Sequence, residues 1–167
     1  MLPEVQVAVG EIKAAREYTL RLLETIDPGS WFRRPDEVVT HVAWQAGHLA
    51  MAQYRLGLER IRGHRPEDDE LISPEFLAHY GKSSAPEPDP AKNPQPDEIM
   101  LVLSRVYFQT LREAPELPDD QWHTAALKPH PLFTTKLGSL LWCARHEMLH
   151  AGQIGLLRRL HGHEPLW

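Results

Sequence analysis

At its centre, the last long segment of the chain reads Arg145-His146-Glu147-Met148-Leu149-His150-Ala151-Gly152-Gln153. This segment contains no proline from Thr135 to His161, and its apolar residues recur at helical spacing, which predicts one helix. The apolar positions are Leu137, Leu140, Leu141, Ala144, Met148, Ala151, Leu156 and Leu160. His146 and His150 are one turn apart on that helix, so their Cβ atoms lie roughly 5–6 Å from each other on one face. Two imidazoles so placed can share a metal ion, and the pair predicts half of a metal site.

A third ligand must come from another part of the chain, and His48 is the strongest choice. It lies in a second helical segment, predicted from Thr40, as N-cap, to Arg62, just before Gly63. Small residues surround it and allow a neighbouring helix to approach closely. They are Ala43, Ala46, Gly47, Ala50 and Ala52.

Other donors for the third position are weaker. Cys143 precedes His146 by three residues, but a lone helical cysteine is usually a small buried hydrophobe. His161 is roughly 16 Å from His150 along the helix, and His41 falls at a helix start. The remaining histidines fall in predicted loops or at the end of the chain. They are His64, His79, His123, His130 and His163.

The other periodic segments complete an all-helical fold. A first helix is predicted from Pro3 to Ile26, and a third begins at Pro96 and ends at Pro115. Residues 63–95 are rich in proline and contain only a short helix at residues 74–80, so they are predicted to form a crossover. Residues 116–134 are predicted to be an irregular connector. The fold expected is an antiparallel four-helix bundle, with the long proline-rich crossover between helices two and three, in one domain over residues 1–167.

The composition of the chain indicates which kinds of partner and which cellular compartment are expected. The 167 residues include 42% hydrophobic and 25% charged residues, with a formal charge of −5, which is typical of a globular protein. This charge argues against a nucleic-acid or anionic-membrane surface. Only Cys143 is available for redox chemistry, and no leader or membrane span is recognisable, so a cytoplasmic protein is expected.

Residues 146–150 also match the His-Glu-x-x-His pattern of zinc peptidases, in which the glutamate is the general base. The extended forms of that motif need further residues of particular types downstream, whereas this chain has Gln153 and Leu157 at or near those places and only seventeen residues after His150. A di-iron bundle needs two Glu-x-x-His pairs, and only Glu147 to His150 has that form. Both alternatives are disfavoured, which leaves the role of Glu147 open.

Two motifs together resemble the DinB/YfiT-like family. Residues 44–50 read Trp-x-x-Gly-His-Leu-Ala, and the last helix reads His-Glu-x-x-His-x-Gly-Gln followed by Leu-Arg-Arg and a close at Gly162–Trp167. The resemblance covers nearly the whole chain. It implies a four-helix bundle with a crossover, a divalent metal, commonly nickel or zinc, on His48, His146 and His150, and often a homodimer. Relatives include S-transferases that use bacillithiol or mycothiol and a maleylpyruvate isomerase.

Three functions follow as hypotheses for a small-molecule substrate. The first is a metal-dependent transferase that uses a low-molecular-weight thiol, the second is a hydrolase that uses a metal-bound hydroxide, and the third is a noncatalytic metal-binding bundle. Around the metal, Gln153 is expected to orient a ligand water or to bond a neighbouring helix. Arg55 lies on the face of His48 and is a candidate to hold an anionic group, and Trp44 is expected to form a pocket wall.

Overall fold

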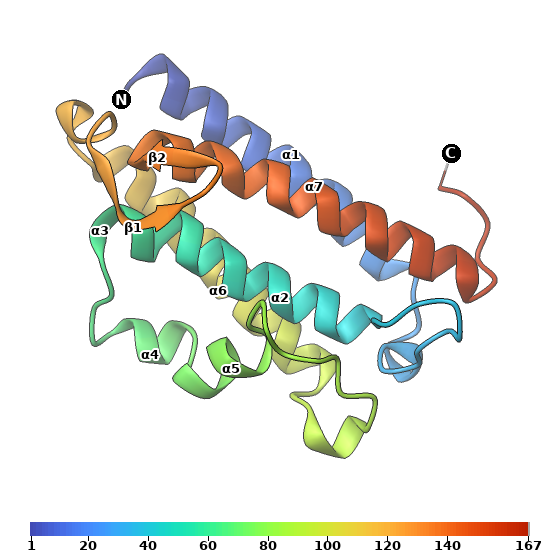
Figure 1. Ribbon diagram of the computed structural model, residues 1–167. Helices are drawn as coiled ribbons and strands as arrows, with labels where there is room; N and C mark the ends of the chain where they lie inside the picture. Colours follow the sequence, from blue (N-terminus) through green and yellow to red (C-terminus); the bar gives the residue numbers. More distant parts are fainter. Residues whose placement is uncertain (167) are drawn as a thin grey trace.

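The computed structural model describes residues 1–166, so Trp167, which closes the C-terminal motif, lies outside the described residues. Four long helices dominate the fold: α1 (Pro3–Glu24), α2 (Val42–Tyr54), α6 (Pro96–Glu113) and α7 (Lys136–Leu160) (Figure 1). A π-helical turn, η2 (Arg55–Glu59), and α3 (Arg60–Arg62) continue α2 in the same direction. The shorter elements are η1 (Pro28–Ser30), α4 (Asp68–Leu71), α5 (Pro74–His79), η3 (Pro90–Lys92), η4 (Ala114–Glu116), η5 (Asp119–Gln121), β1 (Ala125–His130) and β2 (Phe133–Thr135). The prediction of a mostly helical chain is confirmed.

Local chemistry fixes the ends of the helices that carry the histidines. The Thr135 side chain accepts a hydrogen bond from the Gly138 amide at the start of α7, as a good N-cap does. At the start of α2 the cap is His41, whose Nδ1 accepts from the Trp44 amide at 3.2 Å, and not the predicted Thr40. Gly63 ends α3 with a φ of 87°, a conformation that glycine adopts readily.

The long helices form two parallel pairs. Arg16 of α1 bonds Glu147 of α7, and nearer the C-terminal ends Thr25 bonds Arg158, so α1 and α7 run in the same direction (Figure 1). Gly57 lies against Thr110 and Arg62 bonds Glu113 one turn further, so α2 and its continuation run parallel to α6.

The helices of one pair run in the opposite direction to those of the other pair. The expected antiparallel arrangement therefore holds between the pairs but not within them. The crossover between α3 and α6 explains this difference. It carries the chain back along the length of the bundle, so α6 starts at the end where α2 starts.

One cluster of buried apolar residues fills the space between the helices. The predicted stripe of the first helix is buried, with Ile12, Ala15, Leu22 and Ile26 each 3% exposed or less. The stripe predicted for the last helix is wrong at two places, because Met148 and Leu156 are 47% and 51% exposed. Since α7 packs against both α1 and α2, its buried face is set by two neighbours, and a single stripe describes it poorly.

The connector before α7 is not irregular throughout, because β1 and β2 pair as an antiparallel hairpin. The ladder joins Ala125 to Thr135 and His130 to Phe133, with an irregular register between them. Most of its residues are exposed and Pro129 interrupts β1, so the sequence shows no alternation of apolar and polar residues. The imidazole of His130 stacks on the Phe133 ring, with ring centroids 4.2 Å apart.

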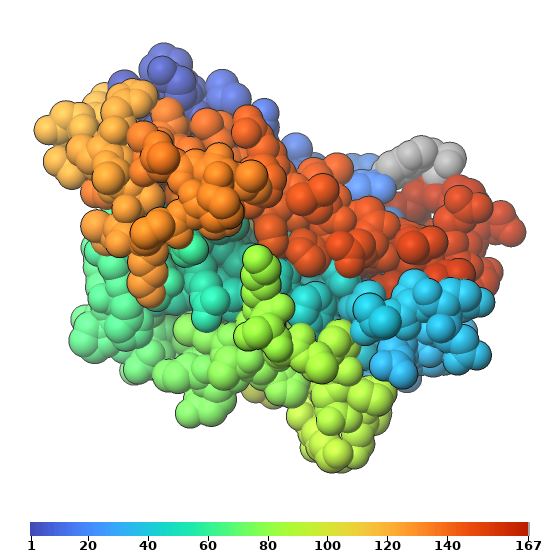
Figure 2. Space-filling model, viewed as in Figure 1, coloured from blue at the N-terminus to red at the C-terminus, as the bar shows by residue number. Residues whose placement is uncertain are grey.

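The crossover packs against the middle of α2. Its predicted short helix is present as α5, and Tyr80, directly after α5, lies with its ring against Gly47. A Cβ at position 47 would meet that ring at 2.5 Å, so the small residue there allows close approach of the crossover and not of a helix. Figure 2 shows the tip of the crossover, in light green, lying across α2 toward α7. Within residues 1–166, no helix is both long enough and apolar enough to cross a bilayer.

Candidate metal centre

The three histidines selected from the sequence meet between α2 and α7. One nitrogen from each of His48, His146 and His150 lies within 4.8 Å of the other two. The ring centroids are 5.3 Å apart for His48 and His146, 4.7 Å for His48 and His150, and 4.5 Å for His146 and His150. His48 is 6% exposed, and His146 and His150 are half-buried.

The crossover and α2 fix the orientation of His48. Its Nδ1 lies 2.8 Å from the Tyr80 carbonyl oxygen, which can only accept, so Nδ1 carries the proton and the lone pair is on Nε2. The Trp44 indole stacks on the same imidazole at 4.6 Å, with 17° between the planes. Trp44 is itself held by a hydrogen bond from its Nε1 to the Ser84 hydroxyl at 3.0 Å. The prediction that Trp44 forms a wall of the site is therefore consistent with the structure.

A glutamine that the sequence analysis did not select fixes His150. The Gln45 side-chain oxygen lies 2.5 Å from His150 Nδ1, while its amide nitrogen donates to the Gln153 oxygen at 2.8 Å and to Thr40. Both amide protons are thus used, and the oxygen accepts from an Nδ1–H, which leaves the lone pair of His150 on Nε2. Such outer contacts orient metal-binding imidazoles and make them more basic. Gln153 therefore bonds the neighbouring helix through Gln45, which is one of the two roles expected for it.

Of these two contacts, the one from Gln45 could have been predicted from the sequence, whereas the one from Tyr80 could not. Gln45 precedes His48 by three residues on a helix of otherwise small or apolar side chains, and a polar residue there indicates a specific partner. Tyr80 contributes its main-chain carbonyl, and a carbonyl leaves no trace in the side-chain pattern.

Burial keeps the three imidazoles neutral. It lowers the pKa of His146 to about 4, with a smaller contribution from the neighbouring His48. It likewise lowers the pKa of His150 to about 3, with help from His146 and His48. The pKa of His48 is also lowered, mainly by burial. Neutral imidazole is the form that binds a metal ion, so the rings need not lose protons at neutral pH.

Glu147 is buried in the core, where it contacts α1. Its carboxylate accepts from Arg16 Nε at 2.7 Å and from Arg16 Nη2 at 3.1 Å, and both side chains are almost fully buried. A general base must reach a water at the metal, and this carboxylate is committed to an arginine of α1 instead. The peptidase interpretation thus conflicts with the geometry of the motif that suggested it.

The weaker donors lie elsewhere. Cys143 is buried and directs its thiol to the Ser139 carbonyl, and burial raises the pKa of that thiol far above its usual value. The His41 Nε2 contacts the Glu87 carbonyl oxygen, and His64 contacts the Tyr54 hydroxyl. Within residues 1–166, His48, His146 and His150 are the one group of three or more potential ligands close enough to share an ion.

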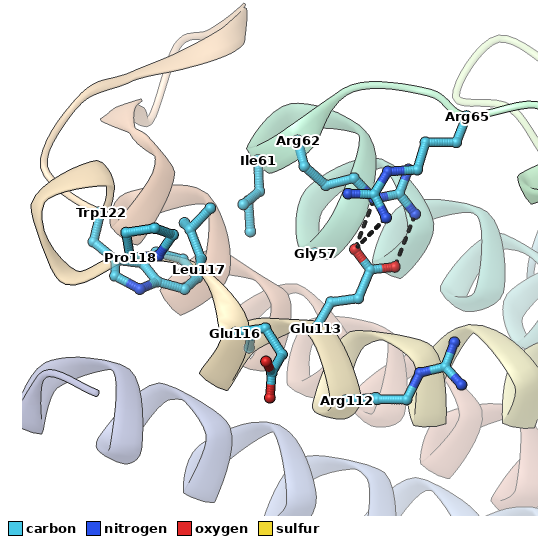
Figure 3. A pocket seen from close by; sticks show the side chains of 11 residues that line it. Gly57, Ile61, Arg62, Arg65, Arg112, Glu113, Glu116, Leu117, Pro118 and Trp122 are labelled. Atoms are coloured by element: carbon cyan, nitrogen blue, oxygen red, sulfur yellow. Dashed lines mark hydrogen bonds and ion pairs between the residues drawn. The ribbon is translucent and has the colours of Figure 1, made fainter.

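A well-formed cavity lies away from the histidines. It has a volume of about 640 Å³ and lies where α3 meets the C-terminal end of α6. Figure 3 shows Arg62 and Arg65 directed at the Glu113 carboxylate in this cavity, with Leu117 and Trp122 on its far wall. Arg62 also bonds Asp68 at 2.6 Å, so its charge is balanced by two carboxylates. This cavity holds a structural ion-pair network.

The histidine cluster fits a divalent ion by its donor chemistry. Two of the three rings have their Nδ1–H bonded to a fixed acceptor, which directs Nε2 toward the shared space. A closed structural site uses more protein ligands than these three imidazoles, so coordination positions of the ion remain open for water or substrate. The arrangement can therefore hold an ion in the manner of a catalytic site.

A comparison with known proteins identifies the family to which the chain belongs. The family model of the DinB superfamily matches residues 11–154, a span that includes all three histidines and at least part of each long helix. The comparison with curated proteins gives no match. Because the family model matches most of the sequence, the chain belongs to the DinB superfamily.

Proposed function

We propose that the protein binds one divalent ion, nickel or zinc, through His48, His146 and His150, and that it is a metal-dependent transferase acting on a small molecule with a low-molecular-weight thiol. The main support for the metal site is that the tautomers of two of its histidines, His48 and His150, are fixed by hydrogen bonds. Tyr80 and Gln45 each hold an Nδ1–H, so two Nε2 lone pairs from different helices converge without any change of protonation.

When bound, an ion in such a site supplies Lewis acidity and makes a bound thiol or water more acidic. The residues of the chain do the rest. Trp44 covers one face of His48 and limits the access of water, and Gln45 keeps His150 in one tautomer. The crossover, through Tyr80 and Ser84, closes the site from the side of α2.

The need for an external thiol is supported by the state of the only cysteine. Cys143 is buried, its thiol has a raised pKa, and it contacts a carbonyl oxygen of its own helix. Since the thiolate is the reactive form, this residue is a poor nucleophile. A thiol-dependent reaction in this protein therefore needs a thiol cosubstrate.

The metal site is tested by metal analysis of purified protein. Wild type is expected to carry about one divalent ion per chain, and replacement of any one histidine of the cluster by alanine should remove most of it. His123→Ala is the matched control, because His123 is exposed and distant from the cluster in sequence. Full occupancy in His146→Ala and His150→Ala would disprove the site.

The reaction class is tested with the metal-loaded protein and a model electrophile. Turnover that requires one of several low-molecular-weight thiols supports the transferase. Turnover with water alone supports the alternative, a metal-dependent hydrolase, and the absence of both supports a noncatalytic metal-binding bundle. The open positions expected of a three-histidine site favour the two enzymatic hypotheses.

We also propose that the protein is a homodimer. The outer face of α7 exposes Met148, Leu149 and Leu156 by 47%, 58% and 51%, and Gly152 between them has no atom that a Cβ would touch within 4 Å. An isologous interface would join this stripe to the same stripe of a second copy. Leu149→Glu should then halve the mass measured by light scattering. Phe108→Glu, on exposed α6, should leave the mass unchanged, and an unchanged mass in Leu149→Glu would reject this interface.

A further inference from the structure

The helix that carries His48 changes its winding at residues 55–59, where the structure has a π-helical turn. In a regular α-helix each residue turns by roughly 100°, so Arg55 would share the face of His48, Glu59 would lie within roughly 20° of that face, and Arg60 would be rotated away by roughly 120°. A π turn contains about one extra residue. The extra residue turns Arg60 back toward the face of His48 and Arg55, and turns Glu59 away from it.

The contacts of these residues agree with that rotation. Glu59 leaves the site and bonds Lys128 of β1, with 2.6 Å between its carboxylate oxygen and Lys128 Nζ. Arg60 instead lies close enough to Arg55 and to His130 for its charge to act on both. The π turn has thus replaced a carboxylate by a guanidinium on the side of α2 that faces the histidines.

The hairpin and the crossover bring further basic groups to the same place. His130, at the end of β1, lies 6.3 Å from the Trp142 ring, and Trp142 is one turn before His146 on α7. Next to burial, the charges of Arg60 and Lys82 lower the pKa of His130, so the tip of the crossover is also near. Four separate segments, α2 with η2, the crossover, the hairpin and α7, therefore surround one mouth.

No carboxylate is bonded to these basic side chains, although the charge of Glu59 still acts on Arg60 from its place beside Lys128. Among residues 1–166, the side chains of Arg55, Arg60 and Lys82 make no hydrogen bond or ion pair, and the buried Nε of Arg60 has no acceptor. The charged groups that act on the pKa values of His48, His146 and His150 are arginine and other histidines, and no acid is among them. In a chain with a formal charge of −5, this is a local reversal of sign.

We infer that this basic mouth, made by Arg55 and Arg60 with Lys82 at its rim, recognises a carboxylate of the substrate. The inference rests on the proposed function, because it describes the substrate of the same metal site. Guanidinium groups match the planar carboxylate with paired hydrogen bonds, and a buried Nε–H without an acceptor is satisfied when such a group arrives. Arg55 is two turns from His48, so the carboxylate is at the end of the substrate remote from the atom that meets the metal.

The test uses glutarate as a dicarboxylate probe and butyrate as the monocarboxylate of similar length. Binding of each to metal-loaded protein is measured by calorimetry, with metal content determined on the same samples. Wild type should bind glutarate at least about tenfold more tightly than butyrate, because only glutarate has a second carboxylate to accept charged hydrogen bonds from the arginines. In Arg55→Gln and Arg60→Gln this preference should disappear while the metal content stays unchanged.

Arg145→Gln is the matched control, because Arg145 adjoins His146 in sequence but points to solvent. It should keep the preference for glutarate. Arg55→Lys retains the charge without the forked donors, and it should lose part of the preference while it preserves the fold. A glutarate preference that survives both glutamine substitutions would overturn the inference, and so would its absence in wild type.

The outcome for the metal is separate from the outcome for the mouth. If wild type contains no metal, the proposed function fails, and glutarate binding is then compared between metal-free wild type and Arg55→Gln. A tighter complex with wild type would still support the basic mouth, whereas equal affinities would overturn it.

Discussion

Arg16 of α1 and Glu147 of α7 form a buried ion pair, with 2.7 Å between Arg16 Nε and the carboxylate, and Glu147 is the residue next to His146 on α7. The pair joins the two helices that run in parallel and fixes the rotation of α7 about its axis. Because Glu147 occupies the core side of the helix, His146 and His150 are turned toward α2. The glutamate of the His-Glu-x-x-His motif therefore acts on the metal ligands indirectly, by fixing the orientation of the helix that carries them.

This relationship predicts the effect of Glu147→Gln. The change leaves the Arg16 guanidinium buried without its counter-charge, and breaking a buried pair in this way typically costs about 3–5 kcal/mol. Urea unfolding should show that loss, whereas the folded variant should still bind about one metal ion per chain. Wild-type stability in the variant would contradict the structural role of this pair, whereas loss of the metal from a folded variant would show that the histidines depend on the pair more strongly than expected.

The contact between Gln45 and His150 predicts an effect on metal affinity. Gln45→Leu removes the acceptor of the Nδ1–H and should weaken metal binding by about 10–100-fold, as is usual for outer contacts of metal-binding histidines. Competition with a chromophoric chelator measures this change. Gln153→Leu is the control, because Gln153 is exposed and reaches His150 only through Gln45, so a small effect is expected. Equal losses in both variants would count against the role of Gln45.

The lowered pKa values of the cluster predict how the metal-free protein responds to acid. In the unfolded chain these histidines titrate near about 6.5, whereas in the fold the pKa of His146 is about 4 and that of His150 about 3. Between these values the unfolded chain binds more protons, so the free energy of unfolding falls as the pH decreases from about 6.5 and levels off near about 3.

The size of this loss is on the order of a few kcal/mol, since each pKa unit corresponds to about 1.4 kcal/mol. Denaturant unfolding of chelator-treated protein from pH 7 to pH 4 measures it. A variant with both His146 and His150 changed to Gln lacks the two titrating groups and should show a flatter profile. If the profiles of wild type and variant coincide, the imidazoles are not held neutral by the fold.

The close approach of Tyr80 to Gly47 predicts the result of adding one methyl group. Gly47→Ala would place a Cβ 2.5 Å from the ring, and such overpacking costs about 1–3 kcal/mol. The Tyr80 carbonyl holds His48, so metal affinity should fall as well. Gly152→Ala is the matched control, because it meets open space and should stabilise the helix by up to about 1 kcal/mol. Thermal unfolding with and without metal distinguishes the two; an unaltered midpoint in Gly47→Ala would show that the ring moves freely.

Residues with strong local periodicity were predictable from the sequence. The spacing of His146 and His150 fixed their common face, and the small residues around His48 indicated a close helix. Features that depend on long-range contact were not predictable. The β1–β2 hairpin is exposed and irregular, so no pattern of burial identifies it, and the parallel pairing of α1 with α7 follows only from the path of the crossover. The Tyr80 carbonyl and the π turn belong to the main chain, which the side-chain pattern does not describe.

The π turn at residues 55–59 also bears on how relatives of this protein can diverge. Because the turn itself contains the extra residue, loss of a single residue within it would restore regular winding and leave the residues beyond it in the same orientation. Arg60 would then stay beside Arg55, and the rest of the fold would not have to move. The turn is thus the mark of a one-residue insertion that the fold has absorbed, and a relative one residue shorter at this point can present the same charges beside its histidines.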